Sequence, residues 1–91
     1  MKHSTIKFIF DSLWVDVYNA CHSLNEGVFN DHVSLLKYKE LVFTCKDFLK
    51  HYNLKNSGQF RYELDYLVYL LEKEGLNVYE WKSYTKLVSY N

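Results

Sequence analysis

The stretch from Asn56 to Leu76, NSGQFRYELDYLVYLLEKEGL, decides the fold. On a helix of 3.6 residues per turn it places apolar side chains in one row and tyrosines in a second row on roughly the opposite side. The apolar row is Phe60, Leu64, Leu67, Val68 and Leu71, and the second row is Tyr62, Tyr66, Tyr69 and Lys73. We therefore predict a helix with a core face and a tyrosine ridge, the name used below for Tyr62, Tyr66 and Tyr69.

Both ends of this helix are also indicated by the sequence. Asn56 or Ser57 can accept a hydrogen bond from the first free N–H groups. Gly75 can adopt the left-handed conformation that closes the last turn, and Leu76 can supply the closing hydrophobic contact. The predicted helix therefore runs from Ser57 to Glu74.

The tyrosine ridge has two interpretations. It packs against the preceding helix or the segment that follows, or it forms a recognition surface. Tyrosine combines a large rigid ring with a hydroxyl that water or a partner can satisfy, which makes it common at interface centres. We expect one part of the ridge to be buried and another part to remain for a partner.

Composition favours one folded, mostly helical domain over residues 1–91. Apolar residues make up 48% of the chain, and it has three glycines and no proline. A core of this size stabilises a fold only marginally, so dimer formation or partner binding would contribute. Aromatic residues make up 19%, nine of them tyrosine, which is more ring surface than a small core can easily hide.

Charge argues against strong general attraction to phosphates. The formal net charge is zero, and Arg61 is the single arginine among the eleven basic residues. Binding to nucleic acid depends on a net or clustered positive field. Only the middle of the chain, residues 37–61, is basic, with Lys37, Lys39, Lys46, Lys50, Lys55 and Arg61 against Glu40 and Asp47.

The two cysteines and the hydropathy pattern indicate an intracellular chain. Cys21 and Cys45 each stand alone in a helical pattern, which favours small core residues over a disulfide or metal ligands. The apolar start is interrupted by Asp11 and Asp16 and lacks a small-residue cleavage site. No stretch approaches the roughly 20 apolar residues of a membrane span. We expect a cytoplasmic protein with no membrane contact.

Two further helices precede the tyrosine-bearing one. Apolar residues recur at steps of three and four from Ser4 to Asn25, with Phe8, Val15 and Tyr18 facing away from the main row. A second pattern begins at the N-cap Asp31 and reaches His51. Along it, Lys39, Lys46 and Lys50 form either a solvated edge or a contact stripe for phosphates or an acidic partner.

After Gly75 the apolar period changes to two. Leu76, Val78 and Glu80 alternate with Asn77, Tyr79 and Trp81, and a similar alternation continues to Tyr90. Two strands meeting at Lys82 and Ser83 would form a β-hairpin, although that turn lacks Asn-Gly or Asp-Gly. We predict an α+β fold of three helices with a C-terminal hairpin. The alternative is a fourth helix over residues 79–89, which would make an all-α small bundle.

No constellation that could carry catalysis stands out. His3, His22, His32 and His51 include no pair at a spacing of four that would suggest a zinc helix. Each of the three glycines has a turn or cap role, so no phosphate-cradling loop is present. No serine sits in the elbow pattern of esterases. We expect a non-enzymatic protein without a catalytic site, metal, cofactor or small-molecule substrate.

The predicted order of elements from Lys37 to Tyr90 is similar in layout to winged helix-turn-helix domains. The similarity would make residues 58–74 the recognition helix and residues 78–90 the wing, as in a DNA-binding transcriptional regulator. Residues placed to meet base edges or phosphates would be Lys39, Lys46, Lys50, Lys55, Gln59, Arg61, Lys82 and Lys86. However, Glu63, Asp65 and Glu72 flank the exposed side of that helix and would be repelled by phosphates.

A protein-binding module fits the neutral charge and abundant tyrosine better than DNA binding does. Its contact patch would contain Tyr62, Tyr66, Tyr69, Lys73, Tyr79, Trp81 and Tyr84. The same patch could close a homodimer. Small lysine- and asparagine-rich chains are typical of phages and mobile elements, which suggests an inhibitor of a host factor.

Overall fold

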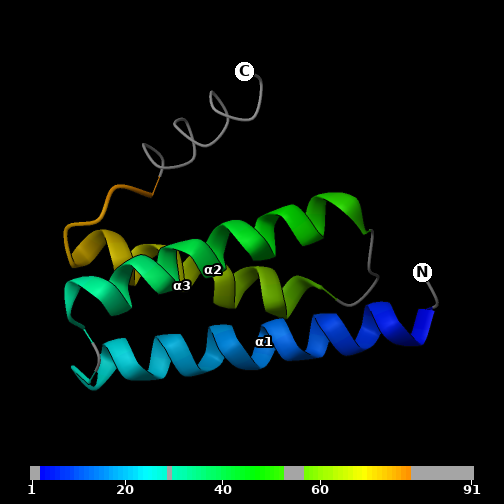
Figure 1. Ribbon diagram of the computed structural model, residues 1–91, viewed down its shortest axis with the longest axis horizontal. Helices are drawn as coiled ribbons and strands as arrows, with labels where there is room; N and C mark the ends of the chain where they lie inside the picture. The colour runs from blue at the N-terminus through cyan, green and yellow to red at the C-terminus, as the bar shows by residue number, and fades with distance from the viewer. Residues whose placement is uncertain (1–2, 29, 53–56, 79–91) are drawn as a thin grey trace.

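Three helices form the fold: α1 (His3–Asn25), α2 (His32–His51) and α3 (Gly58–Lys73). The computed structural model describes residues 3–28, 30–52 and 57–78. Each helix packs against the other two, so the core lies between all three. Figure 1 shows the three helices from the side, with α1 below α2 and α3 in this view. The predicted bounds of all three helices agree with the structure to within a residue or two.

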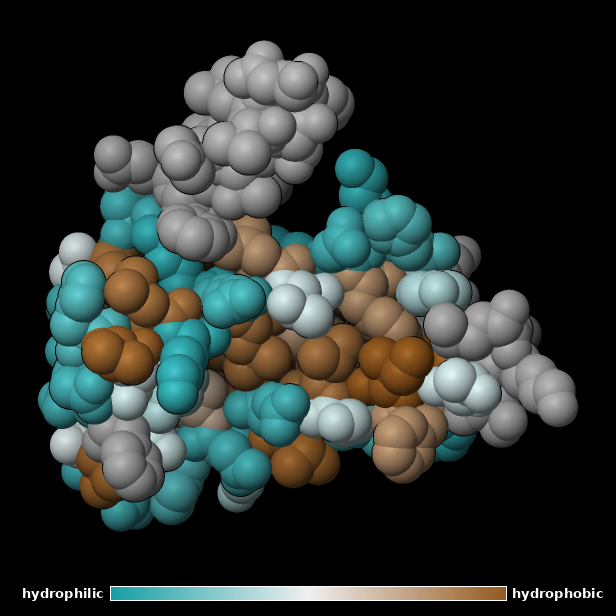
Figure 2. Space-filling view, in the orientation of Figure 1, coloured by the Kyte–Doolittle hydropathy of each residue, from teal (hydrophilic) through white to brown (hydrophobic). Residues whose placement is uncertain are grey.

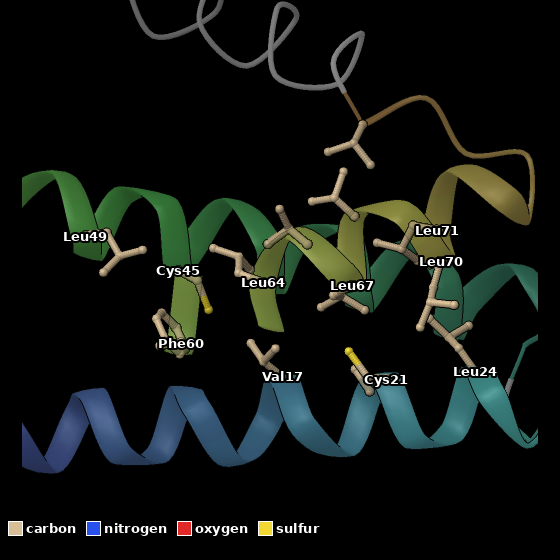
Figure 3. Packing of buried hydrophobic residues seen from close by; sticks show 14 of the residues in the cluster. Val17, Cys21, Leu24, Cys45, Leu49, Phe60, Leu64, Leu67, Leu70 and Leu71 are labelled. Carbon is tan, nitrogen blue, oxygen red and sulfur yellow. The ribbon is translucent and has the colours of Figure 1, made fainter. Parts of the chain in front are cut away.

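The apolar row of α3 is buried, as predicted. Phe60, Leu67 and Leu71 retain no exposed surface, and Leu64 and Val68 are buried beside them. Their neighbours across the core include Val17, Cys21 and Leu24 of α1 and Cys45 and Leu49 of α2 (Figure 3). Full burial of one such side chain contributes roughly 1.5–3 kcal/mol. The row is therefore the main connection between α3 and the other two helices.

Aromatic rings fill one end of this core. Phe10 of α1 lies with its ring centroid 5.0 Å from that of Phe60 and 6.4 Å from that of Phe48. Trp14 meets Phe60 edge-on at 6.0 Å. Such tilted and edge-to-face pairs add to the stabilisation that burial alone provides. One ring from α1 thus contacts both α2 and α3.

Among the described residues, part of the apolar core reaches the surface. Figure 2 shows apolar side chains gathered across the middle of one face, among hydrophilic ones. Half-buried apolar residues packed against the core include Ile6, Ile9, Leu13, Tyr38 and Leu41. Apolar surface of this kind is expected because so small a domain buries a limited fraction of its chain.

The predicted helix ends are confirmed at α2 and at the end of α3. The Asp31 carboxylate accepts hydrogen bonds from the backbone N–H and the hydroxyl of Ser34, and these bonds lower the pKa of Asp31. At the end of α3, Gly75 has φ of 94°. The N–H groups of Gly75 and Leu76 donate to the carbonyls of Glu72 and Leu71, at 2.9 and 3.1 Å. These two bonds define a Schellman motif, and Leu76 packs against the core as the motif requires.

The start of α3 differs from the prediction. Ser57 occupies the N-cap position but its side chain makes no capping bond to the helix backbone. Its hydroxyl oxygen instead accepts a hydrogen bond from Arg61 Nε at 3.2 Å. A side chain one turn into the helix has therefore taken the oxygen that the backbone N–H groups would have used.

The predicted α+β fold is wrong. The described residues hold three helices and no strand, so this part of the chain is a small all-helical bundle and not α+β. The fourth helix considered over residues 79–89 lies outside the described residues. Leu76, expected to begin the first strand, closes the C-terminal motif of α3, and Val78 is buried in the helical core. The winged helix-turn-helix layout is lost with the hairpin. Residues 79–91, which include most of the predicted hairpin, lie outside the described part.

The cysteines are small core residues, as predicted. Cys21 and Cys45 are both buried, free thiols. Burial, with a smaller effect from the nearby charge of Glu63, raises the pKa of Cys21 to about 11. Burial, with a smaller effect from Asp16, raises the pKa of Cys45 to about 12. Both thiols therefore stay protonated in the folded protein at neutral pH.

We predict that Gly75→Ala destabilises the protein by about 1–2 kcal/mol, because alanine resists a left-handed conformation. An added Cβ meets no atom within 4 Å there, so the backbone alone carries the cost. Gly58→Ala is the matched control: Gly58 lies in the first turn of α3 with equally open surroundings, and alanine favours helix. Urea denaturation measures both variants. Equal midpoints for the two would contradict the helix-end assignment.

A second prediction concerns alkaline pH. Below pH 9.0, the ordinary thiol pKa, both cysteines are protonated in the folded and the unfolded chain, so they do not change the free energy of unfolding with pH. Above it the unfolded chain ionises while the folded thiols do not, so stability falls as pH rises toward about 11 and 12. The fall between about pH 8 and pH 10.5 should be smaller in a Cys21→Ala/Cys45→Ala variant, or in either single variant. Urea midpoints at each pH test this, and parallel declines would refute it.

Candidate functional site

The tyrosine ridge faces solvent along α3. Tyr62, Tyr69 and Tyr66 are 71, 57 and 38% exposed, although the opposite side of the same helix is fully buried. Lys73 is exposed one turn beyond Tyr69 and ends the row. The helical period separates the two rows, because residues three and four apart share a face. The structure therefore brings these four residues together on one surface.

Two contacts fix Tyr66 within the ridge. Its hydroxyl donates a hydrogen bond of 3.1 Å to Asn25 Oδ1 at the end of α1. Its ring lies nearly parallel to that of Tyr69, with centroids 6.3 Å apart and planes 17° apart. The bond crosses 41 residues of sequence, so it forms only after α1 and α3 have packed. Tyr66 thereby holds the middle of the ridge in place, and Tyr62 and Tyr69 project on either side of it.

Apolar side chains of α1 are exposed as well. Phe8, Val15 and Tyr18 are 74, 57 and 60% exposed, in agreement with their predicted position away from the core. Tyr18 and Asn25 are seven residues apart and so share one side of α1. Because Asn25 contacts Tyr66, Tyr18 lies on the edge of α1 nearest to α3. The aromatic surface thus continues from α3 toward α1, which the sequence pattern of α3 alone did not indicate.

Polar side chains border the ridge. Gln59 Nε2 donates to Glu63 Oε1 at 3.5 Å along α3. On α1, next to Asn25, His22 Nε2 and Glu26 Oε1 approach to 3.5 Å. An aromatic patch with a mixed polar rim is the usual composition of a protein–protein interface.

A groove of about 400 Å³ lies between α2 and α3. Its lining residues are Lys46, Leu49, Lys50, Arg61, Leu64 and Asp65. Three of the residues predicted for phosphate contact, Lys46, Lys50 and Arg61, therefore meet in one place. Their convergence depends on the packing of α2 against α3, which the sequence did not reveal.

The other predicted nucleic-acid contacts do not join them. Lys39 is buried, so it is absent from the solvated lysine edge that the sequence suggested. Gln59 is exposed but bonds to Glu63 outside the groove. Lys55, Lys82 and Lys86 lie outside the described residues, as do Tyr79, Trp81 and Tyr84 of the predicted protein-binding patch.

Within the described ranges, no three histidine, cysteine or acidic side chains are grouped so that they could hold a metal ion. Nor does any helix described there have the length and apolar content needed to cross a membrane. No known protein family, curated protein or solved structure matches the chain. Geometry and chemistry therefore carry the functional argument.

We predict that Tyr66→Phe lowers the free energy of unfolding by about 0.5–1.5 kcal/mol, because it removes the bond to Asn25. Tyr62→Phe is the matched control: Tyr62 is 71% exposed and its hydroxyl has no hydrogen bond among the described residues, so removal of that hydroxyl should be neutral. Thermal and urea unfolding measure both. If Tyr66→Phe proved as stable as Tyr62→Phe, the Asn25 bond would not anchor the ridge.

Proposed function

We propose that this chain is a small non-enzymatic binding protein that acts through protein–protein contact, with the tyrosine ridge of α3 as its contact surface. One observation carries the proposal: α3 buries one row of side chains in the core and exposes three tyrosines on the opposite side. The fold does not need these rings in its core. The exposed surface of these rings can therefore contact a partner.

Tyrosine at these positions suits recognition for physical reasons. Each ring presents a large surface with only two side-chain torsions to restrict, so little conformational entropy is lost on binding. Tyr66 has already lost much of its freedom through the Asn25 bond and the stack on Tyr69. A partner that covers the ridge would thus meet a partly preorganised surface.

The charge pattern favours a protein over a nucleic acid at this surface. Asp65 and Glu72 flank the ridge on one side and Glu63 on the other, while the chain as a whole is neutral. Carboxylates beside a polyphosphate are repelled and reduce its affinity. The same carboxylates are ordinary rim residues in a protein interface.

Two finer parts of the proposal rest on composition. The first is that binding inhibits a host factor, as small phage-like proteins do. The second is an intracellular setting, which the two free thiols support. The contact could equally join two copies of this chain.

The proposal predicts that Tyr62→Ala/Tyr69→Ala weakens partner binding by at least tenfold and leaves the helical content unchanged. Truncation of a central interface tyrosine commonly costs about 2 kcal/mol or more. The partner would first be identified by capture from the native host with the wild-type chain. Its affinity for each purified variant would then be measured by calorimetry.

Val33→Ala/Leu36→Ala is the control for loss of exposed apolar surface, since both residues lie on α2 and are 60 and 39% exposed. It should bind the partner like the wild type. Light scattering on each variant separates self-association from binding of another protein. If the tyrosine variant and the α2 variant bound the partner with equal affinity, the ridge would not be part of the interface.

A further inference from the structure

The groove between α2 and α3 is a second surface, distinct from the tyrosine ridge. We propose that it docks an acidic segment of a protein partner, with a carboxylate held by Lys46, Lys50 and Arg61 above an apolar floor. The inference does not depend on the ridge, and its test can fail or succeed separately.

The shape of the groove fits a short segment of side chains. Leu49 and Leu64 are buried residues that line its base, while Lys50 and Arg61 are exposed at its edges and Lys46 is half-buried. A volume of about 400 Å³ accommodates a few side chains. A segment with an aliphatic residue next to a carboxylate would therefore contact both the leucines at the base and the cations around them.

Within the described ranges, the positive charge in the groove is only partly balanced, by one carboxylate. Three cations line it against one carboxylate, Asp65. In the described part of the protein, neither lysine lies within 4.0 Å of an acidic oxygen, and Asp65 makes no ion pair with Arg61. Elsewhere on the surface, pairs four residues apart do form, as between Lys7 and Asp11. Among the described residues, the three cations of the groove therefore have no ion-pair partner, and we expect them to bind an external acid.

Arg61 is positioned for this role. Its Nε donates to the Ser57 hydroxyl, which restrains the side chain, and its Nη groups make no hydrogen bond within the described residues. A guanidinium presents its N–H groups in a planar fork that matches the two oxygens of a carboxylate. The bond from Arg61 Nε to the Ser57 hydroxyl therefore restrains the guanidinium, the strongest carboxylate-binding group in the chain.

A discrete carboxylate fits the groove better than a nucleic acid does. Asp65 lines the groove itself, and Glu72 follows on the same edge of α3 two turns later. A polyphosphate would bring successive charges against both of them. An acidic protein segment can place one carboxylate among the three cations and aliphatic carbon on the leucines.

The groove also adjoins the ridge. Asp65 and Tyr69 are four residues apart on α3, so they are neighbours on its surface. A partner that covers the ridge would therefore reach the groove with an adjacent segment.

The test titrates the ¹⁵N-labelled full chain with the blocked peptide Leu-Glu-Asp-Leu, and separately with its amide counterpart Leu-Gln-Asn-Leu. We expect the acidic peptide to shift the backbone signals of α2 and α3 around the groove and the amide peptide to leave them unchanged. Lys46→Gln/Lys50→Gln should lower the affinity for the acidic peptide by about tenfold. Lys50→Gln alone, at an exposed position, should lower this affinity by a smaller factor.

Lys7→Gln/Lys37→Gln removes the same charge at exposed positions outside the groove and should change the affinity by less than about twofold. Equal weakening by the two double variants would show general charge attraction and overturn the proposal. So would absence of groove shifts, or tighter binding of a twelve-base-pair DNA duplex at the same residues. Tyr62→Ala/Tyr69→Ala should keep the peptide response, which separates this site from the ridge.

Discussion

The burial of one row of α3 between α1 and α2 is the constraint on which the rest of the structure depends. Phe60, Leu67 and Leu71 lose all contact with water, and each can do so only if both other helices are in place. A helix of 16 residues has little stability of its own, since most helical stability comes from packing of the apolar face. Fixing that face inward also fixes which side chains of α3 point outward.

The parts of this fold that could be predicted are those governed by local rules. Helical period identified the buried row of α3, and cap chemistry placed Asp31 and Gly75 correctly, because both depend on residues within one or two turns. The strand predicted to begin at Leu76 was wrong because, in the described residues, the alternation of Leu76 and Val78 has a different cause. Leu76 is apolar to close a helix end and Val78 to join the helical core, and two such residues imitate the period of a strand. Ser57 failed as a cap because Arg61, one turn away, competed for its oxygen.

The candidate surfaces divide in the same way. Exposure of the tyrosine ridge follows from the period of α3, so the sequence indicated it. The bond from Tyr66 to Asn25, the burial of Lys39 and the meeting of Lys46 with Arg61 each depend on how two helices pack. No spacing rule within one helix contains that information. The helical period of α2 therefore predicted a solvated edge of Lys39, Lys46 and Lys50, whereas packing buries Lys39.

The exposed half of α3 carries both surfaces, and this arrangement has a physical advantage for so small a domain. A ring that contributes little to the core can be replaced or covered without loss of the fold. Substitutions of Tyr62 and Tyr69 should therefore affect binding with little effect on the free energy of unfolding. Tyr66 differs, since its hydroxyl also joins α3 to α1. Binding at the ridge would therefore act on the α1–α3 contact through Tyr66. A partner that bound only the folded chain, at the ordered ridge, would stabilise that folded state, and this gain would add to the limited stability of so small a core.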